Sequence, residues 1–576
     1  MKVRTFTSAA LLALACCVCF GGYVARTRAN APGGTLYALR DAQENIAYAR
    51  VIRLEHSGSR NGVLLSTFER WNNDESPGSF LIQQSRDDGQ TWSALGTASD
   101  GERGPGHPWP IMWQPFLFEL PQALGRYPAG TLLLAGNVGS RGAKDTHFQL
   151  WRSADHGAHW DYVSTFQTGG SVNPGRGIWE PFLGLDRQGR LVCYFSDERQ
   201  FATHSQILAH LVSDDGGDTW GPEVADVASD RQADRPGMAT VARLSDGSYL
   251  MSYEVCGPPG CEVHVKRSPD GDRWGESPFD LGARPETPDG RYLIGSPYLV
   301  RTPGPNREGR LMLAAHSASL TKGGGAPESG QIVLLNSRSG RGAWSWMPAP
   351  SRPLYSPSGN ANTVYSPCLL PSRDGKSIRL TVPSGGAPLG RESTQAGPTD
   401  LLPYRDDFAA GTDAGWIDYG GEWSLSGAAY GSAGAAKAVA GSTGWADYKL
   451  DADIKLLSPG QAGLLFRVTD PGAGPDDVHG YAARLSSVGG ALTLGEEDRD
   501  WKPFASVTLP EGVRIGVWYH ITVRASGDSL DASVQRAGER AAEVKVKARD
   551  ASSPFGAIGL SSWDAQASWR NVKVTK

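Results

Sequence analysis

Short apolar stretches separated by glycine-led turns recur along the first 385 residues of the chain. Five of them follow a glycine and end in a polar residue, at residues 62–69, 130–137, 189–196, 247–254 and 309–316, and a looser sixth copy spans 375–382. Apolar runs of this length between turn residues are typical of β-strands. Six copies of one unit predict an all-β fold with a six-bladed β-propeller, each blade a four-stranded antiparallel sheet.

A second motif, Ser-x-Asp-x-Gly-x-x-Trp, lies between the repeats. It begins at Ser85, Ser153 and Ser213, with a shortened copy at Ser268 and a degraded one at Ser337. The Asp accepts bonds from backbone N–H groups, the Gly adopts a positive φ, and the Trp packs into the sheet. We expect structural turns between the third and fourth strands of each blade. The motif resembles the Asp-box of sialidase-type propellers.

The first strands of the blades align as well, from Tyr48, Trp113, Trp179, Gly237, Gly295 and Tyr365. In antiparallel sheets, the start of a first strand and the end of a second strand lie at the same edge. That edge collects polar and aromatic side chains around the propeller axis, and we predict a site there. The residues expected to contact a substrate are Arg50, Glu69, Gln114, Asn137, Trp179, Arg235, Ser296 and His316.

Two carboxylates in this ring, Glu180 and Glu254, suit the cleavage of a glycosidic bond. That reaction needs one protonated carboxyl group for the leaving oxygen and one ionised carboxylate for the anomeric carbon or a water. Trp179 next to Glu180 offers a partly desolvated setting that raises a carboxyl pKa. Tyr253 and Arg235 are expected to keep Glu254 ionised.

The segments GIWEPFL, RPGMATVARLSDGSYLMSYEVCG and YSPCLL, together with the six blades, resemble the exo-arabinanases of glycoside hydrolase family 93. The resemblance covers roughly residues 35–384. It implies that Glu254 is the nucleophile, that Glu180 is the general acid/base and that Tyr365 lies near the nucleophile. It also implies a retaining, exo-acting hydrolase of α-1,5-L-arabinan, a plant cell-wall polysaccharide.

Two alternatives remain open at this point. An exo-α-sialidase needs an arginine cluster that clamps the substrate carboxylate, and Arg50, Arg235 and Arg301 are the candidates. The neutral residues of the ring, Gln114 and Ser296, suit a neutral sugar better. The other alternative is a sugar-binding propeller without catalysis.

Residues 1–30 have the features of a signal peptide, with basic residues before an apolar run from 9 to 20. We therefore expect a secreted protein without stable membrane association, and a monomer. The net charge of −5 gives no electrostatic reason to expect nucleic acid as a partner. We expect no metal and no cofactor.

Four cysteines follow the signal peptide. Cys256 and Cys261 flank a tight Gly-Pro-Pro-Gly loop and are close enough for a disulfide, which export permits. Cys193 and Cys368 fall in apolar runs and are expected to be buried thiols.

The remaining chain has a different pattern. Residues 386–403 are rich in Gly, Pro, Ser and Thr and are predicted to be a linker after a catalytic propeller at 31–385. From 404 to 576, alternating strands predict an antiparallel β-sandwich that resembles the concanavalin-like jelly rolls of secreted glycosidases. We expect it to bind carbohydrate and to be removable without loss of turnover on short oligosaccharides. Its candidates for sugar stacking are Trp423, Tyr481, Trp501 and Trp563, but core packing is the expected role of each, because alternating strands bury half of their aromatic residues. The acidic segment 496–498 has the residue types of a Ca²⁺ site, but a solvated turn is expected there.

Overall fold

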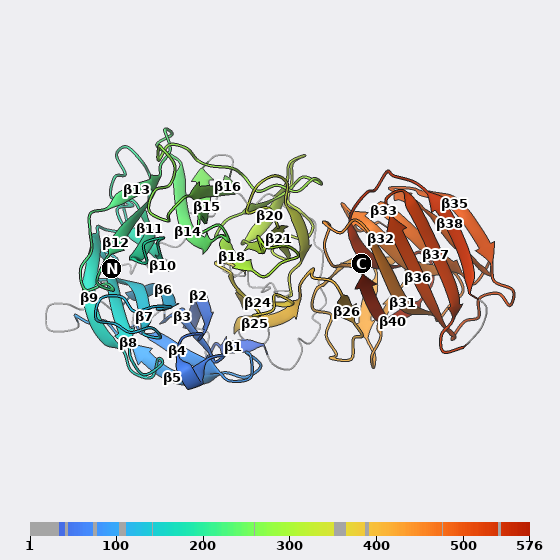
Figure 1. Ribbon diagram of the computed structural model, residues 1–576, viewed down its shortest axis with the longest axis horizontal. Helices are drawn as coiled ribbons and strands as arrows, with labels where there is room; N and C mark the ends of the chain where they lie inside the picture. The colour runs from blue at the N-terminus through green and yellow to red at the C-terminus, as the bar shows by residue number, and fades with distance from the viewer. Residues whose placement is uncertain are drawn as a thin grey trace, which may run out of the picture.

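The computed structural model describes residues 34–40, 44–72, 78–102, 111–140, 142–257, 260–350, 364–385, 391–474, 476–539 and 543–576. A ring of small sheets lies beside a two-layered sandwich (Figure 1). This confirms the predicted fold class. The predicted signal peptide lies outside the described residues. Within the described residues, no helix is long and apolar enough to cross a membrane.

Each blade of the propeller is an antiparallel sheet whose first strand lies innermost. Blades one to three contain β2 (Glu44–Arg53), β3 (Leu64–Asn72), β4 (Phe80–Ser85) and β5 (Ser93–Ala98); β6 (Ile111–Glu119), β7 (Leu132–Gly139), β8 (Thr146–Ser153) and β9 (Asp161–Gly169); and β10 (Ile178–Leu185), β11 (Leu191–Asp197), β12 (Ile207–Ser213) and β13 (Val224–Val227). A single 3₁₀ turn, η2 (Gly58–Arg60), is described between β2 and β3.

Blade four gains an extra strand. It contains β14 (Arg235–Arg243), β15 (Tyr249–Gly257), β16 (Gly260–Ser268) and β17 (Arg291–Ile294), and β20 (Ser317–Leu320) adds to β17. Blade five contains β18 (Tyr298–Thr302), β19 (Arg310–Ala314), β21 (Ile332–Asn336) and β22 (Ser345–Pro348).

The sixth blade combines three strands from the end of the propeller with the first described strand of the chain, β1 (Thr35–Ala38). The three strands are β23 (Cys368–Pro371), β24 (Ser377–Ser384) and β25 (Arg391–Pro398), and β1 lies outermost. Because β1 pairs with β25, the N-terminal strand closes the ring. The structure corrects the linker predicted at 386–403, since 391–398 is a strand in register with β24. Its residues Glu392, Ser393 and Thr394 are buried, so the polar composition that indicates a linker here belongs to a strand.

The Ser-x-Asp-x-Gly-x-x-Trp segments form the expected turns. In the first copy, the Ser85 hydroxyl accepts the Gly89 N–H at 2.7 Å and Asp87 accepts the Thr91 N–H at 2.9 Å. The equivalent bonds recur in the copies that begin at Ser153 and Ser213. The glycine of each copy has a positive φ, 81° at Gly89. These turns join the third and fourth strands and so lie at the edge opposite the predicted site.

The C-terminal domain is the predicted sandwich. One sheet runs in the order β28-β29-β40-β31-β36-β37-β38, with β26 beside β40, and the other in the order β27-β30-β39-β32-β33-β34-β35. The strand bounds are β26 (Tyr404–Asp406), β27 (Trp416–Tyr419), β28 (Glu422–Leu425), β29 (Tyr430–Ala433), β30 (Ala436–Ala440), β31 (Tyr448–Leu456), β32 (Gln461–Thr469), β33 (His479–Ser486), β34 (Ala491–Asp498), β35 (Trp501–Thr508), β36 (Trp518–Ser526), β37 (Ser529–Arg536), β38 (Val544–Arg549), β39 (Ala557–Ser562) and β40 (Ala567–Thr575).

The aromatic candidates of the sandwich divide into two pairs. Trp423 and Tyr481 are buried in the core between the sheets. Trp501 and Trp563 instead make cation–π contacts with the Arg484 guanidinium, whose central carbon lies 3.8 and 4.0 Å from their ring centroids. The acidic segment 496–498 belongs to strand β34 and not to a turn. Among the described residues, no three potential ligands gather to hold a metal ion.

The sandwich packs closely on the propeller. Ile417 and Val439 of the sandwich share a buried apolar cluster with Leu293, Leu320 and Trp346 of the propeller. Removal of 404–576 would expose this cluster to water, at a cost of roughly 25 cal/mol per Å² of apolar surface. The structure therefore argues against the expectation that the sandwich can be removed without affecting the propeller.

Candidate active site

A residue in an unusual backbone conformation lies in the first part of the inner strand of each blade or just before it. Such a bulged residue turns its side chain out of the regular alternation of the strand. In the first four blades the register shifts by one or more residues at this place. Six residues with φ between 36° and 58° occupy the equivalent positions, namely Tyr48, Gln114, Glu180, Met238, Ser296 and Ser366. Four of them, Tyr48, Gln114, Glu180 and Met238, line one cavity on the propeller axis.

The structure corrects the sequence alignment in blade one. The ring position belongs to Tyr48. Arg50 lies two residues further along β2, is buried, and also lines the cavity. Arg50 donates to the Ser366 hydroxyl at 2.8 Å and to the Ser366 carbonyl at 3.2 Å, so it fastens blade one to blade six. A proline follows Gln114 and Glu180, but none follows Tyr48. Without this proline, the sequence of blade one can be aligned with the other blades in more than one way.

Glu180 lines the cavity, and its two carboxyl oxygens have different surroundings. Its Oε1 accepts a bond from Gln114 Nε2 at 3.2 Å and a longer one from the Tyr48 hydroxyl at 3.5 Å. Its Oε2 is buried and makes no hydrogen bond of normal geometry within the described part of the chain, although the Ser196 hydroxyl lies close enough to the carboxyl group to lower its pKa. Burial raises the pKa of Glu180 to about 8, and the charges of Glu254 and Glu198 add to this, against the Ser196 hydroxyl and Arg235. The carboxyl group is therefore protonated at neutral pH.

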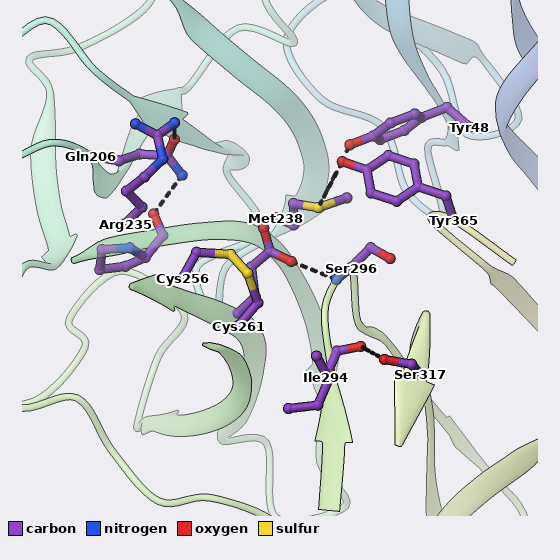
Figure 2. Close-up of a disulfide and its surroundings, with 12 residues drawn as sticks. Tyr48, Gln206, Arg235, Met238, Cys256, Cys261, Ile294, Ser296, Ser317 and Tyr365 are labelled. Carbon is purple, nitrogen blue, oxygen red and sulfur yellow. Dashed lines mark hydrogen bonds between the residues drawn. A yellow bond between two sulfur atoms is a disulfide. The ribbon is translucent and has the colours of Figure 1, made fainter. Parts of the chain in front are cut away.

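Glu254 has a different environment at the end of β15. Its Oε2 accepts the backbone N–H of Ser296 at 2.6 Å, a short charge-assisted bond that stabilises the carboxylate. Burial raises the pKa of Glu254, while the Ser296 N–H and the charge of Arg235 act in the opposite direction. Figure 2 shows Arg235, Ser296 and Tyr365 on different sides of this strand end.

The expected role of Tyr253 is wrong, and that of Arg235 is only partly as expected. The Tyr253 hydroxyl donates to the Leu281 carbonyl at 2.6 Å and its ring is buried, because neighbouring residues of a strand point to opposite faces. The Arg235 guanidinium binds Glu198 and, at 2.6 Å, Gln206. Its charge still lowers the pKa of Glu254.

Two tyrosines and a histidine lie together near the two carboxyl groups. The Tyr365 ring lies edge-on to the ring of Tyr48, with centroids 5.6 Å apart, and to that of His316 at 5.9 Å. Both tyrosine hydroxyls contact Met238 Sδ at 3.7 Å (Figure 2). Burial, and then the charges of Glu254 and Glu180, raise the pKa of Tyr365, so it remains protonated. Burial lowers the pKa of His316, which favours the neutral imidazole.

The other expected residues link neighbouring blades. Asn137 is fully buried and donates to the Ile178 carbonyl at 2.7 Å, which fixes the strand that carries Glu180. Glu69 accepts the Gln114 N–H at 3.1 Å, and burial raises the pKa of Glu69 to about 8. The Ser296 hydroxyl accepts the Ser366 N–H at 3.0 Å.

Trp179 packs against Trp113 of the preceding blade, with ring centroids 5.7 Å apart. The sequence interpretation missed Tyr48, Met238 and Glu198 as residues of this site. Moving the alignment of blade one by one residue would have placed Tyr48 opposite Gln114 and Glu180. No motif singles out Met238 or Glu198.

The arginine cluster that a sialidase requires does not form. Arg50 is buried against Ser366, and Arg235 is engaged by Glu198. Arg301 lies near the far end of β18 and donates to the Glu308 carbonyl at 2.9 Å. Because the three guanidinium groups are held at separate places, they cannot clamp one carboxylate.

A disulfide joins Cys256 and Cys261 across the β15–β16 hairpin, two residues beyond Glu254 (Figure 2). Cys193 and Cys368 are free and buried, as expected. The Cys261 carbonyl accepts the N–H of Gly295 at 2.8 Å, and Gly295 precedes the residue that binds Glu254. The disulfide therefore stabilises the backbone that surrounds this carboxylate.

We predict that the double substitution Cys256→Ser and Cys261→Ser lowers kcat about tenfold, because small displacements of a reacting group are costly. Steady-state kinetics on an arabino-oligosaccharide, the substrate class that the sequence resemblance implies, would check this, with Cys193→Ala as the control for loss of a thiol elsewhere. An unchanged kcat in the double variant would contradict the positioning role.

Comparison with known proteins agrees with this architecture. The model of the 3-keto-alpha-glucoside-1,2-lyase-like domain matches residues 406–575. A GH93 alpha-L-arabinofuranosidase of Fusarium graminearum, solved with arabinobiose, is 27% identical with a TM-score of 0.54, over 64% of this chain and 97% of that one. An alpha-L-arabinanase of Penicillium chrysogenum, also with arabinobiose, is 28% identical with a TM-score of 0.52, over 64% and 98% of the two chains.

No curated protein sequence matches the chain. The similarity to the two solved structures extends along nearly their whole length, and it confirms the resemblance that the strand motifs indicate. The chain is a glycoside hydrolase whose propeller is similar to the family 93 arabinanases and whose C-terminal sandwich is of the concanavalin-like type.

Proposed function

We propose that the protein is a secreted, retaining, exo-acting hydrolase of α-1,5-L-arabinan, with Glu254 as nucleophile and Glu180 as general acid/base. The observation that carries the proposal is the contrast between the two carboxyl groups. Glu180 has a pKa of about 8 and a buried oxygen that makes no hydrogen bond of normal geometry to the described residues, which suits a proton donor. Glu254 holds a short bond from a backbone N–H, which suits an ionised nucleophile.

In the first step, a carboxylate oxygen of Glu254 attacks the anomeric carbon as the bond to the leaving oxygen breaks. Glu180 transfers its proton to that oxygen, so the departing sugar leaves as a neutral alcohol. Glu180 is now an anion and takes a proton from water, which attacks the arabinosyl ester of Glu254. The second displacement restores both carboxyl groups and releases arabinose or an arabinosyl unit with its original configuration.

A neutral pentose fits the polar groups around the pair. The neutral amide of Gln114 bonds to Glu180, and the three candidate arginines are held at separate places by Ser366, Glu198 and Glu308. The two similar fungal enzymes were solved with arabinobiose. Secretion is supported by the signal-like residues 1–30 and by the disulfide, which is typical of oxidising compartments.

Product analysis on linear α-1,5-arabinan tests this function. An exo enzyme releases one short product from the start, with little fall in the viscosity of the polymer. A ladder of intermediate lengths would indicate endo action, and turnover of a sialyl substrate but not of arabinan would contradict the proposal.

The pH profile provides a further prediction. Since Glu180 must be protonated to act as an acid, kcat/KM should fall as the pH rises through about 8. On the acid side it should fall as Glu254 becomes protonated, at a pH above that of an ordinary Glu because burial raises its pKa. Initial rates with an arabino-oligosaccharide between pH 3 and pH 10 (roughly the range of these titrations) would check this. A flat profile between about pH 6 and pH 10 would contradict the acid role of Glu180.

A further inference from the structure

A two-stranded ribbon, formed by β17 and β20, extends from the mouth of the propeller to the sandwich. Its strands pair from Arg291 opposite Leu320 to Ile294 opposite Ser317. Ser296 follows β17 after one glycine, and His316 immediately precedes β20. One end of the ribbon therefore carries two residues of the site, one on each strand.

Backbone bonds fix this end of the ribbon. The Gly295 N–H binds the Cys261 carbonyl at 2.8 Å, and the His316 N–H binds the Gly295 carbonyl at 3.0 Å. The Ser296 N–H then meets the Glu254 carboxylate at 2.6 Å. Figure 2 shows Ile294 and Ser317 below Ser296, with the Ser317 hydroxyl donating to the Ile294 carbonyl at 3.4 Å. Among the described contacts, the Ser296 N–H is the only backbone group that donates to Glu254. Its position depends on the position of β17, which precedes it by one glycine.

The other end of the ribbon is anchored by a buried cation. Arg291 is completely buried and binds both oxygens of Glu328, at 2.8 and 3.1 Å. The sandwich completes this arrangement, because the Tyr419 hydroxyl donates to Glu328 at 2.6 Å. Asp470 of the sandwich lies 3.4 Å from Arg291 and 3.2 Å from Lys322, which follows β20.

Apolar contacts run along the same ribbon. Leu293 of β17 and Leu320 of β20 belong to one buried cluster with Ile417, Tyr419 and Val439 of the sandwich. Buried ion pairs are sensitive to the loss of one partner, since a charge left in an apolar setting is costly. The ribbon is thus held by the sandwich through both charge and packing.

We propose that the sandwich is a positioning domain of the active site, which holds Ser296 and His316 in place through the β17–β20 ribbon. This rests on the proposed function, because Glu254 is the group that the ribbon positions. The sandwich does not touch the substrate in this role. Loosening its contacts displaces the Ser296 N–H, weakens its bond to Glu254 and raises the pKa of that carboxyl group.

The test removes the polar contacts by which the sandwich holds Arg291, Glu328 and Lys322, together with the Asp470–Arg499 pair inside the sandwich. The double variant Tyr419→Phe and Asp470→Asn leaves the Arg291–Glu328 pair of the propeller intact. The control is Thr443→Val, which removes the bond from the Trp346 N–H at 2.9 Å in the same interface and leaves the polar contacts of Arg291, Glu328 and Lys322 in place. The full-length proteins are compared in kcat, in the pH profile of kcat/KM and in Tm, well below the unfolding temperature.

We expect kcat to fall about tenfold in the double variant, and the acid limb of its profile to move to higher pH, while the control changes neither. Equal losses of Tm in both variants, without a change in kcat or in the acid limb, would show that the interface is merely stabilising and would overturn the proposal. A wild-type protein without glycosidase activity would instead contradict the proposed function.

Discussion

Glu254→Gln is expected to abolish hydrolysis of arabino-oligosaccharides, with kcat lowered about 10⁴-fold or more, as for other enzymes that lose their nucleophile. The amide keeps the shape of the side chain and a carbonyl oxygen for the Ser296 N–H, so the fold should be unaffected. It cannot form the glycosyl ester, because a neutral amide oxygen is a poor nucleophile. Rates with an activated aryl arabinofuranoside would be low as well.

The matched control for this variant is Glu276→Gln, an exposed carboxylate in the segment between β16 and β17. Its kcat should equal that of the wild type. A Glu254→Gln protein that retains a tenth or so of the activity, with the Tm unchanged, would exclude Glu254 as the nucleophile.

Glu180→Gln is expected to have an effect that depends on the leaving group. General acid catalysis contributes about 10²–10⁴-fold, and a natural sugar leaving group needs all of it. A dinitrophenolate leaves without a proton, so cleavage of a dinitrophenyl arabinofuranoside should remain fast. Hydrolysis of the ester intermediate then becomes limiting, because no base activates the water.

The same variant should lose the basic limb of the pH profile near pH 8, since that limb reports the titration of Glu180. Added azide, which needs no base, should accelerate turnover of the activated substrate. Equal losses on natural and activated substrates, with an unchanged basic limb, would show that Glu180 is not the acid.

Much of the propeller follows from local patterns in the chain. The glycine-led strands and the Ser-x-Asp turns are read within a few residues, and the structure reproduces both. The closure of the ring is different, because β1 and β25 are about 350 residues apart and neither has a distinctive sequence. The polar residues of β25 look like a linker until their pairing with β24 is known.

The catalytic pair follows from the repeat, but several of its neighbours do not. A bulge of one residue reverses which side chains face the axis, and it leaves no periodic signal. That is why Tyr48 is missed at the ring position of blade one, although Arg50, two residues further on, also lines the cavity. The role of Arg291 is equally hidden, since its partners Glu328, Tyr419 and Asp470 come from distant parts of the chain.

The most direct test of the account is to trap the glycosyl ester. Glu180→Gln incubated with a dinitrophenyl arabinofuranoside should accumulate an enzyme that carries one arabinosyl unit, visible by intact mass spectrometry. After digestion with trypsin, the unit should lie on Glu254 in peptide 244–266. An adduct on Tyr365, or the absence of any adduct while turnover continues and the product configuration is inverted, would contradict the assignment of Glu254 as the nucleophile of a retaining reaction.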